Sequence, residues 1–448
     1  MRNLSLRFFL PMKGDPMSNR ISRRDALKAS GALATGLCLG TGVSFTRADS
    51  PNEKLNVACI GVGGQGGGHT RAMDGSQNLI AIADVDEKRA GGNWQLVPAD
   101  ARYHDFRKLF DKVGGKLDAV VIATPDHTHF HAGYYAMQLG LHTYIEKPMT
   151  HNVWECRTLT DMAKQKQLAT QLGVQRHTKS NMSRVVELIK SGAIGPVREV
   201  YSVIGSGRGM PGLPGDEPEV PDYLDYDLWV GPAEYRPYHP SFCPYGWRFW
   251  WDYGTGETGN WGCHILDIPF WALDLKYPTR VDATGPEVDP ERTPKSMHSV
   301  FQFPARGDQP PVTLHWSQGS MNLPPELKEK VSGRGNTLFV GEKGMLMCDF
   351  DHRQLLPEEK FAEFEEPEPF LPGQADFRGQ WIDACKGGKP ASCNFDYSGP
   401  LTETVLLANV AYRAGGGFDW NAEKLEAKGN DKAQALIRET FRKGWEIA

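Results

Sequence analysis

Short runs rich in apolar residues alternate with helical patterns in the first half of the chain. Strand-like runs occupy 55–60, 79–83, 117–123 and 143–145, a further strand is predicted at 169–175, and helices are predicted at 130–139 and 153–166. The run at 117–123 is almost continuously apolar, which is typical of a parallel strand covered on both faces. This alternation predicts a doubly wound parallel sheet over residues 53–175.

The pattern changes after residue 175. A helix is predicted at 180–191, and strand-like runs follow at 197–204, 297–303, 311–318, 336–340 and 345–348, with helices near 375–385, 400–414 and 431–445. Residues 205–260 are rich in Gly, Pro and aromatic side chains, as expected for loops that shape a pocket. Residues 176–448 are therefore predicted to form an α+β domain with a large, mainly antiparallel open sheet and helices on one face.

A cluster of glycines follows the first strand. The loop Gly61-Val62-Gly63-Gly64-Gln65-Gly66 fits G-x-G-x-x-G, and the second strand ends at Asp84, eighteen positions after Gly66. Such glycines allow a tight turn, close approach of a pyrophosphate and close helix packing, and an acid at this distance suits a ribose. The first domain is thus predicted to be a Rossmann domain that binds NAD; NADP is disfavoured because a carboxylate repels its 2′-phosphate. The predicted cofactor-binding residues here are Gly61, Gly63, Gly64, Gln65, Gly66 and Asp84.

The first 48 residues resemble a twin-arginine export signal. Ser22-Arg23-Arg24 precedes a weakly apolar run at 29–45, and Thr46-Arg47-Ala48 offers small residues around a cleavage point. The run is too short and too mild for a stable membrane span. Met17 is an alternative start. We therefore expect a periplasmic or otherwise exported protein, whose nucleotide stays bound and is returned to its starting redox state within each cycle or by a partner.

The amino-acid composition limits the kinds of partner that the protein is expected to bind. A net charge of −5 over 448 residues gives no basic surplus for nucleic acid or anionic membrane. Small neutral or weakly charged substrates fit better, and 12 Trp and 14 Tyr suit the binding of sugars, although many of these rings are expected in the core.

Neither cysteines nor histidines indicate a metal. Cleavage would remove Cys38 and leave seven scattered cysteines without C-x-x-C, which argues against a disulfide framework and a zinc site. A single Cys385–Cys393 disulfide stays open. Five histidines between 104 and 142 lack nearby acid or thiolate ligands in a metal-binding pattern, so no metal is predicted.

An ordered set of motifs resembles the glucose–fructose oxidoreductase, inositol dehydrogenase and MocA (Gfo/Idh/MocA) family. Besides the glycine loop and Asp84, the set comprises Thr124-Pro125-Asp126-His127-Thr128-His129, Glu146-Lys147-Pro148, Gly195, Trp247-Arg248 and Gly262-Cys263-His264. The resemblance implies a Rossmann domain followed by an open-sheet domain that often forms a dimer or tetramer interface. It also implies oxidation or reduction of a sugar, cyclitol or similar alcohol by a pyridine nucleotide. Some relatives in that family are glycosidases that use bound NAD as a transient oxidant.

The resemblance places several residues beside the cofactor. The loop at the end of strand 117–123 should lie near it, because the carboxyl ends of strands line the ligand crevice. The additional predicted cofactor-binding residues are Thr124, Pro125, His127, His129, Glu146, Lys147, Trp247 and Arg248.

Lys147 is the leading catalytic candidate. A lysine at the end of a buried strand, beside a positively charged nicotinamide, should have a lowered pKa and could exchange a proton with a substrate hydroxyl. Glu146 could orient it, and Pro148 would fix the following chain.

His264 is the second catalytic candidate, as the base that takes a hydroxyl proton. A helical reading places Asn260, His264 and Asp267 on one face. Many relatives have Asp where this chain has Asn260, and an amide cannot hold a proton, so Asp267 is a partial substitute. Gln175, Arg176, His177 and Trp250 are weaker pocket candidates.

These observations predict an exported NAD(P)-dependent oxidoreductase of a sugar, glycoside or polyol that keeps its cofactor. Two alternatives stay open. One is a redox-neutral glycoside hydrolase or lyase working by transient oxidation, and the other is a nucleotide-binding protein without catalysis.

Overall fold

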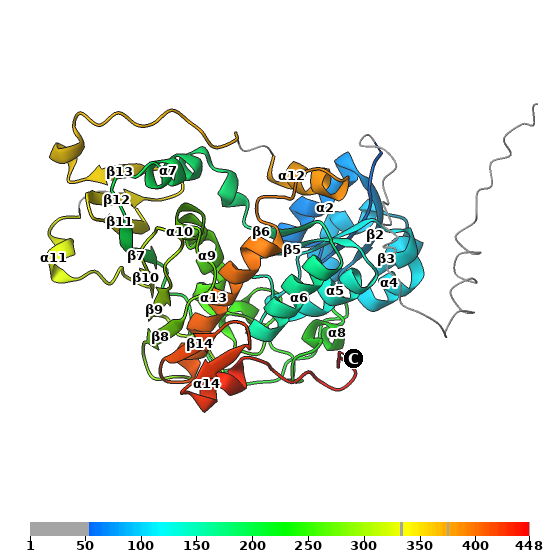
Figure 1. Cartoon of the computed structure of the whole chain (residues 1–448). Coiled ribbons are helices and arrows are strands. Elements are labelled where there is room, and N and C mark those ends of the chain that lie inside the picture. Colours follow the sequence, from blue (N-terminus) through cyan, green and yellow to red (C-terminus); the bar gives the residue numbers. More distant parts are fainter. Residues whose placement is uncertain (1–52, 332–334, 374–375, 448) are drawn as a thin grey trace, which may run out of the picture. The chain divides into compact units, whose positions relative to one another are not determined.

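The structure is a computed structural model that describes residues 53–331, 335–373 and 376–447 (Figure 1). The predicted export segment, residues 1–48, lies outside the described residues.

The first domain contains a six-stranded parallel sheet, drawn in blue and cyan in Figure 1. Its strands are β1 (Asn56–Ile60), β2 (Asn78–Ala83), β3 (Arg102–Tyr103), β4 (Ala119–Ile122), β5 (His142–Glu146) and β6 (Thr170–Gly173). Its helices are α2 (Gly64–Ser76), α3 (Glu87–Ala90), α4 (Phe106–Val113), α5 (Asp126–Gln138) and α6 (Val153–Gln165). The strand order is β3-β2-β1-β4-β5-β6, which is that of a Rossmann fold.

This order creates the ligand crevice. The chain crosses from β1 to β2 on one side and later returns to β4 on the other side of β1. The loops after β1 and β4 therefore diverge at the switch point of the sheet, where ligands bind in open α/β folds.

The second domain contains a nine-stranded sheet with the order β13-β12-β11-β7-β10-β9-β8-β14-β15. Its strands are β7 (Val197–Ile204), β8 (Arg280–Thr284), β9 (Met297–Phe303), β10 (Val312–Gln318), β11 (Thr337–Gly341), β12 (Gly344–Cys348), β13 (Arg353–Leu356), β14 (Phe418–Asn421) and β15 (Glu426–Lys428). Only the β7–β10 pair among these described neighbours is parallel, so the expected mainly antiparallel sheet is confirmed.

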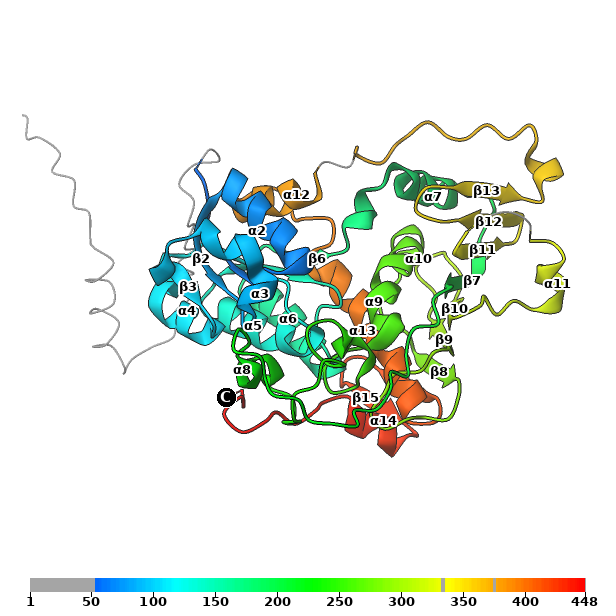
Figure 2. The same ribbon diagram turned by 180° about the vertical axis from the view of Figure 1, so that it is seen from behind.

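One long helix of the second half packs between the two sheets. The helices of this half are α7 (Ser180–Lys190), α8 (Tyr226–Val230), α9 (Gly256–Ile265), α10 (Asp267–Leu273), α11 (Pro325–Lys328), α12 (Phe377–Cys385), α13 (Phe395–Arg413) and α14 (Asp431–Leu436). In both views α13, in orange, lies between the parallel sheet and the second sheet (Figure 2). It contacts α6 and β6 on one side and α9 and β8 on the other, so one helix joins both cores.

The aromatic region predicted to shape a pocket forms a small core of its own. Its buried side chains are Leu224, Tyr226, Trp229, Val230, Phe242, Cys243, Trp247, Trp250 and Tyr253. Because these rings pack together, the connections between them are held in place without regular strands. Trp250 belongs to this core and donates its indole N–H to the Ser241 carbonyl, so it is not a pocket residue.

The structure corrects several boundaries. The helix predicted at 431–445 ends at Leu436, because the segment that follows bonds to distant backbone: Trp154 N–H donates to the Ile437 carbonyl, and Arg442 N–H donates to the Pro232 carbonyl. The helix predicted at 400–414 begins earlier, at Phe395, where the side chain of Asn394 caps it. Strands β8, β13, β14 and β15 were not predicted.

The seven cysteines within the described residues are buried free thiols, so the structure does not form the Cys385–Cys393 disulfide. Within the same residues, no helix has both the length and the apolar character needed to cross a bilayer.

Candidate active site

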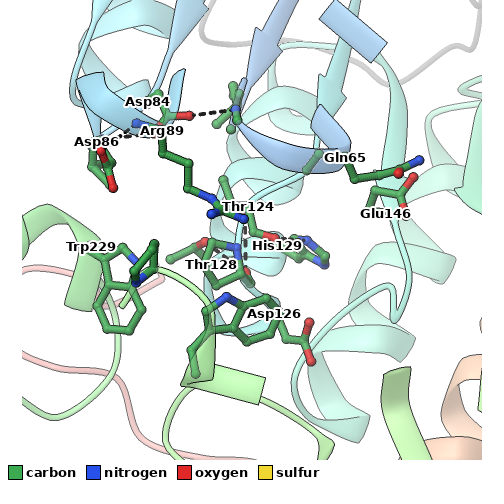
Figure 3. Close-up of a pocket in the computed structure, with 18 of the residues that line it drawn as sticks. Gln65, Asp84, Asp86, Arg89, Thr124, Asp126, Thr128, His129, Glu146 and Trp229 are labelled. Carbon is green, nitrogen blue, oxygen red and sulfur yellow. Dashed lines mark hydrogen bonds between the residues drawn. The ribbon is translucent and has the colours of Figure 1, made fainter. Parts of the chain in front are cut away.

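A cavity of about 410 Å³ opens at the carboxyl ends of β1, β2, β4 and β5 (Figure 3). The predicted residues that line it are Gly61, Gly63, Gln65, Asp84, Thr124, Pro125, His129, Glu146, Lys147, Trp247, Arg248 and His264. The weaker candidates Gln175 and Arg176 line it as well. Gly64, Gly66, His127, Asn260 and Asp267 were predicted for the site but are not in its lining.

The glycine loop is packed so closely that side chains would collide. Gly61 has φ +76°, and a Cβ there would lie 2.7 Å from the backbone carbonyl carbon of Ala123. A Cβ at Gly66 would lie 1.8 Å from the carbonyl oxygen of Gly61. Gly66 therefore does not line the cavity, but its missing side chain leaves room for the Gly61 carbonyl, so the loop can turn beneath the start of α2.

The start of α2 is suited to phosphate. No side chain caps this thirteen-residue helix, and its first turn contains no acid. The first N–H groups of a helix have no partner within it and attract anions, so the cavity edge formed by Gly63 and Gln65 fits a pyrophosphate.

Asp84 holds the glycine loop while lining the cavity. Its Oδ2 accepts hydrogen bonds from the N–H groups of Val62 (2.7 Å) and Gly63 (3.2 Å). Burial raises the pKa of this carboxyl. The sequence interpretation missed its neighbour Arg89, which reaches from beside Asp86 toward Thr124 in Figure 3. An Arg89 nitrogen would lie 3.0 Å from a Cβ at Gly64, so this cation lies against the glycine loop.

Glu146 is held by a buried hydrogen-bond network. Its Oε1 lies 2.7 Å from Nε2 of His69 and accepts from the Gln175 amide at 2.6 Å. Arg378 donates to Nδ1 of His69, which leaves Nε2 as the nitrogen that carries a proton toward Glu146. Burial alone raises the pKa of Glu146, but the bond from His69 and the nearby Lys147 bring it below its ordinary value. The carboxylate is therefore ionised beside Lys147.

Lys147 opens onto the cavity and has a neutral partner. Its Nζ donates to Oδ1 of Asn260 at 2.9 Å. Burial lowers the pKa of Lys147, and the carboxylates of Glu146 and Asp126 oppose that effect in part. The lowered pKa is the environment expected for proton exchange.

Asn260 is oriented by a second contact one turn earlier in α9. Its Nδ2 lies 3.5 Å from Oε2 of Glu257, a fully buried side chain that also pairs with Arg208. A carboxylate only accepts and an ammonium only donates, so the amide must present its oxygen to Lys147 and its nitrogen to Glu257. A carboxylate is thus present three residues earlier, in contact with the amide of Asn260.

His264 reaches the same cavity from α9. Burial, with a further contribution from the charge of Lys147, lowers the pKa of His264 to about 3. Its Nδ1 is buried and has no hydrogen-bond partner among the described residues. His264 is therefore neutral near pH 7 and lines the cavity.

Helix α9 reaches this position through contacts with both domains. Asp126, at the start of α5, accepts hydrogen bonds from the backbone N–H (3.2 Å) and the hydroxyl (2.6 Å) of Thr255, the residue that precedes α9. Asn409 of α13 donates to the Thr255 carbonyl. Asp126 also lines the cavity, and its place in the Thr124–His129 motif was the available signal for it.

The structure places His127 away from the cavity, which corrects its prediction as a cofactor ligand. Its ring nitrogens lie 2.9 Å from the Trp229 carbonyl and 3.2 Å from the Tyr253 carbonyl. Burial lowers its pKa to about 3. His127 therefore ties α5 to the aromatic core, whereas His129, which lies 2.8 Å from the Thr124 and Pro148 carbonyls, lines the cavity.

Asp267 does not substitute for an acid at position 260. Its oxygens lie 2.9 and 3.0 Å from Nδ1 of His177, and one accepts from the Tyr397 hydroxyl at 2.5 Å. Together with Cys393, His177 and Asp267 form a buried group of three potential metal ligands within the described residues. The His177–Asp267 bond already pairs two of them, so the group is explained as a link between η4 (Gln175–Thr178) and α10.

Two profiles of one oxidoreductase family match the sequence. The profile for the NAD-binding Rossmann fold of the Gfo/Idh/MocA family covers residues 55–174, and that for the family's C-terminal alpha/beta domain covers residues 211–305. The chain belongs to the Gfo/Idh/MocA family. The resemblance, the fold class and NAD as the cofactor are therefore confirmed.

Curated Gfo/Idh/MocA relatives match part of the chain. UDP-N-acetylglucosamine 3-dehydrogenase of Acidithiobacillus ferrooxidans is 34% identical over 119 residues, which are 27% of this chain and 36% of that protein. Inositol 2-dehydrogenase of Rubrobacter xylanophilus is 30% identical over 154 residues, 33% of this chain and 43% of that protein. A glycosyl hydrolase family 109 protein of Shewanella pealeana is 26% identical over 175 residues, 33% of this chain and 38% of that protein. The chain thus spans less than half the length of these relatives.

Solved structures share the fold over most of this chain. The WlbA dehydrogenase from Bordetella pertussis, in complex with NADH and UDP-GlcNAcA, aligns with a TM-score of 0.58 at 16% identity, covering 82% of this chain and 99% of that chain. The aldose-aldose oxidoreductase from Caulobacter crescentus, complexed with glycerol, aligns with a TM-score of 0.52 at 18% identity and covers 82% and 100%. These likenesses establish the fold of this Gfo/Idh/MocA chain.

Proposed function

We propose that the protein is an NAD-dependent oxidoreductase that oxidises a hydroxyl-bearing carbon of a sugar, glycoside or polyol. The observation that carries the proposal is a lysine of lowered pKa, Lys147, lining the same cavity as the glycine loop and Asp84. Dehydrogenases of a nucleotide sugar and of inositol among the relatives support a hydroxylated substrate.

The residues present fit NAD. The uncapped start of α2 offers N–H groups for the pyrophosphate, Arg89 adds a cation beside the loop, and Asp84 has a carboxylate at the ribose position. When bound, NAD supplies a nicotinamide carbon that accepts a hydride.

We assign to Lys147 the role of accepting the proton of the substrate hydroxyl. With a lowered pKa, a fraction of its amine is uncharged and can take the hydroxyl proton as hydride leaves the carbon. Asn260 holds Nζ in place from one side. His264, neutral and lining the cavity, orients the hydroxyl by accepting a hydrogen bond and is a weaker base than the sequence predicted, since its pKa is about 3.

The test is NADH formation. Purified protein supplied with NAD and a panel of sugars, polyols and glycosides should show absorbance of NADH with at least one compound, and Lys147→Ala should abolish it. A panel that gives no NADH, while the protein retains NAD, favours the remaining candidate, a nucleotide-binding protein without catalysis.

A redox-neutral glycosidase is a second candidate, because a glycosyl hydrolase family 109 protein is among the relatives. Oxidation of a ring hydroxyl, commonly considered at C3, would acidify the neighbouring C–H, so that the aglycone could leave by elimination. Water addition and return of the hydride would then complete a balanced hydrolysis. Aglycone release from a chromogenic glycoside without an external acceptor would favour this reaction over a simple dehydrogenase.

We also propose export by the twin-arginine route with NAD retained. The proposal rests on the Ser22-Arg23-Arg24 pattern before an apolar run. Changing Arg23 and Arg24 together to Lys should leave the protein in the cytoplasmic fraction. Mass spectrometry of the small molecules released from the denatured, purified protein should find NAD; finding none would contradict retention.

A homo-oligomer formed through the nine-stranded sheet is proposed as well. Helices α9 and α13 contact this sheet, and residues 321–331 cover part of its opposite face, so the second subunit is proposed to pack on the remainder of that face. Light scattering coupled to size exclusion should give a mass of two or four chains, and a monomeric mass would contradict it.

A further inference from the structure

Arg176 brings a positive charge to the lining of the cavity. It is the second residue of η4, directly after β6, and it lines the cavity together with Gln175 and His264. Its charge is one of the influences that lower the pKa of His264, after burial and Lys147. The guanidinium is therefore near His264, one of the two residues assigned to the substrate hydroxyl.

The side chain of Arg176 is held by aromatic rings. Its guanidinium carbon lies 4.6 Å from the ring centroid of Phe350 and 5.3 Å from that of Trp261. Among the described residues, no carboxylate, carbonyl or hydroxyl forms a hydrogen bond or ion pair with this guanidinium. Contact with rings uses the flat face of the group and leaves the N–H donors at its edge available.

The other cations of the cavity have different surroundings. Lys147 donates to Asn260, and Arg89 lies against the glycine loop, where phosphate is expected. Arg248 donates to the Tyr245 carbonyl at 3.4 Å and stacks on Trp247. Arg176 is thus the cavity cation that lies near His264 without a hydrogen-bond acceptor among the described residues.

A carboxylate matches this geometry. Two parallel N–H groups of a guanidinium bind the two oxygens of a carboxylate, and such charge-assisted bonds are about twice as strong as neutral ones. A neutral sugar would leave the edge of the guanidinium facing hydroxyl groups, which satisfy fewer of its donors.

We propose that the substrate is a sugar acid and that Arg176 binds its carboxylate. This inference rests on the proposed function and narrows its substrate from sugars in general to uronates and related acids. The carboxylate on Arg176 anchors one end of the molecule, while Lys147 and His264 bind the hydroxyl to be oxidised.

The experiment compares acids with their neutral amides. Calorimetric titrations of the NAD-loaded full-length protein would use D-glucuronate and D-galacturonate, the corresponding uronamides, and the parent sugars. At least one acid should bind roughly tenfold more tightly than its amide, and this preference should weaken as NaCl is raised. NADH formation is measured separately on the same compounds.

Variants assign the preference to one side chain. Arg176→Gln should reduce binding of the acid to the level of the amide. Arg176→Lys should keep part of the preference for the acid, because lysine retains the charge but lacks the two parallel N–H groups of the guanidinium. Arg438→Gln is the matched control, since Arg438 also stacks on a ring, that of Trp154 at 4.0 Å, but lies outside the cavity lining.

Several results would overturn the proposal. These are failure of both acids to bind, equal binding of acid and amide, a preference that survives in Arg176→Gln, and loss of NAD binding in Arg176→Gln. Binding of an acid through Arg176 without any NADH formation would instead contradict the proposed oxidation and leave the carboxylate site standing.

Discussion

The cavity has two walls that are built in different ways. The cofactor wall consists of the loops after β1, β2, β4 and β5, and its shape depends on glycines at which a Cβ would meet backbone at 1.8 to 2.7 Å. The substrate wall consists of Gln175, Arg176, Trp247, Arg248 and His264, which are brought together from η4, η5 (Gly246–Phe249) and α9. The comparison indicates that substitutions in the cofactor wall lower the stability of the fold, whereas substitutions in the substrate wall change the charges that a substrate meets.

The largest effect is expected where the two walls meet, at Lys147. Lys147→Met removes the proton acceptor, so the rate of NADH formation should fall by roughly 10² to 10⁴ while NAD binding persists. Steady-state kinetics and NAD titration measure the two quantities. The control is Lys112→Met on the exposed side of α4. A variant at position 147 that keeps its rate would remove the lysine from the mechanism.

A smaller effect is expected within the substrate wall, at Asn260. Asn260→Asp would place a carboxylate where an amide oxygen now lies 2.9 Å from Nζ of Lys147. An opposite charge at this distance favours the ammonium, so the pKa of Lys147 should rise by about one to three units. The base is active when deprotonated, so the rising limb of kcat/KM against pH should move to higher pH, with lower activity near neutrality.

The neighbour of Asn260 provides the matched comparison. In Asn260→Asp a second carboxylate faces Glu257 across a short distance, and adding Glu257→Gln removes that repulsion while preserving the total charge. The double variant should show the full shift in the pKa of Lys147. If no substrate is found, the pH dependence of acylation of Lys147, followed by peptide mass spectrometry, reports the same pKa. An unshifted titration in both variants would mean that Asn260 does not set the charge of Lys147.

The last comparison concerns stability and not rate, and it uses two alanines at the start of α2, which test whether close packing behind the cofactor wall matters. Gly66→Ala would force the Gly61 carbonyl to move and should lower the free energy of unfolding by about 1 to 3 kcal/mol and release NAD. Gly68→Ala lies in the same helix with nothing within 4 Å of its new Cβ, so stability should change little or rise by up to about 1 kcal/mol. Thermal unfolding with and without NAD compares the pair. Equal behaviour of the two variants would contradict the packing argument.

Sequence patterns were sufficient where structure is local. The apolar runs predicted five of the six strands of the parallel sheet, all but the two-residue β3, and β9 begins and ends at the predicted residues. Helix ends were less predictable: α13 begins at Phe395 because Asn394 caps it, although Pro400 resembled a helix start. Strands β14 and β15 are too short to show a clear alternation of side chains.

The site shows the same division. The glycine loop follows a buried strand and could be located by its spacing, and Lys147 was singled out by the resemblance to the family. His127 and His129 lie two residues apart in α5, and only packing showed which of them faces the cavity. His127 turned toward the aromatic core and His129 toward the cavity. Asp267 was predicted to substitute in part for an acid at position 260, because it lies on the same helix face. Its carboxylate instead binds His177 and Tyr397, which are distant in sequence.

The sequence by itself determined that a Rossmann domain with an NAD-binding glycine loop precedes an open-sheet domain, because strand periodicity and the G-x-G-x-x-G spacing are properties of neighbouring residues. Only the tertiary structure decided how the charges around Lys147 are arranged. It placed Glu257 beneath Asn260, Arg378 and His69 behind Glu146, and Arg176 over Phe350. These contacts join residues far apart in the chain or on one helix face, and their energies depend on burial, which no local pattern specifies.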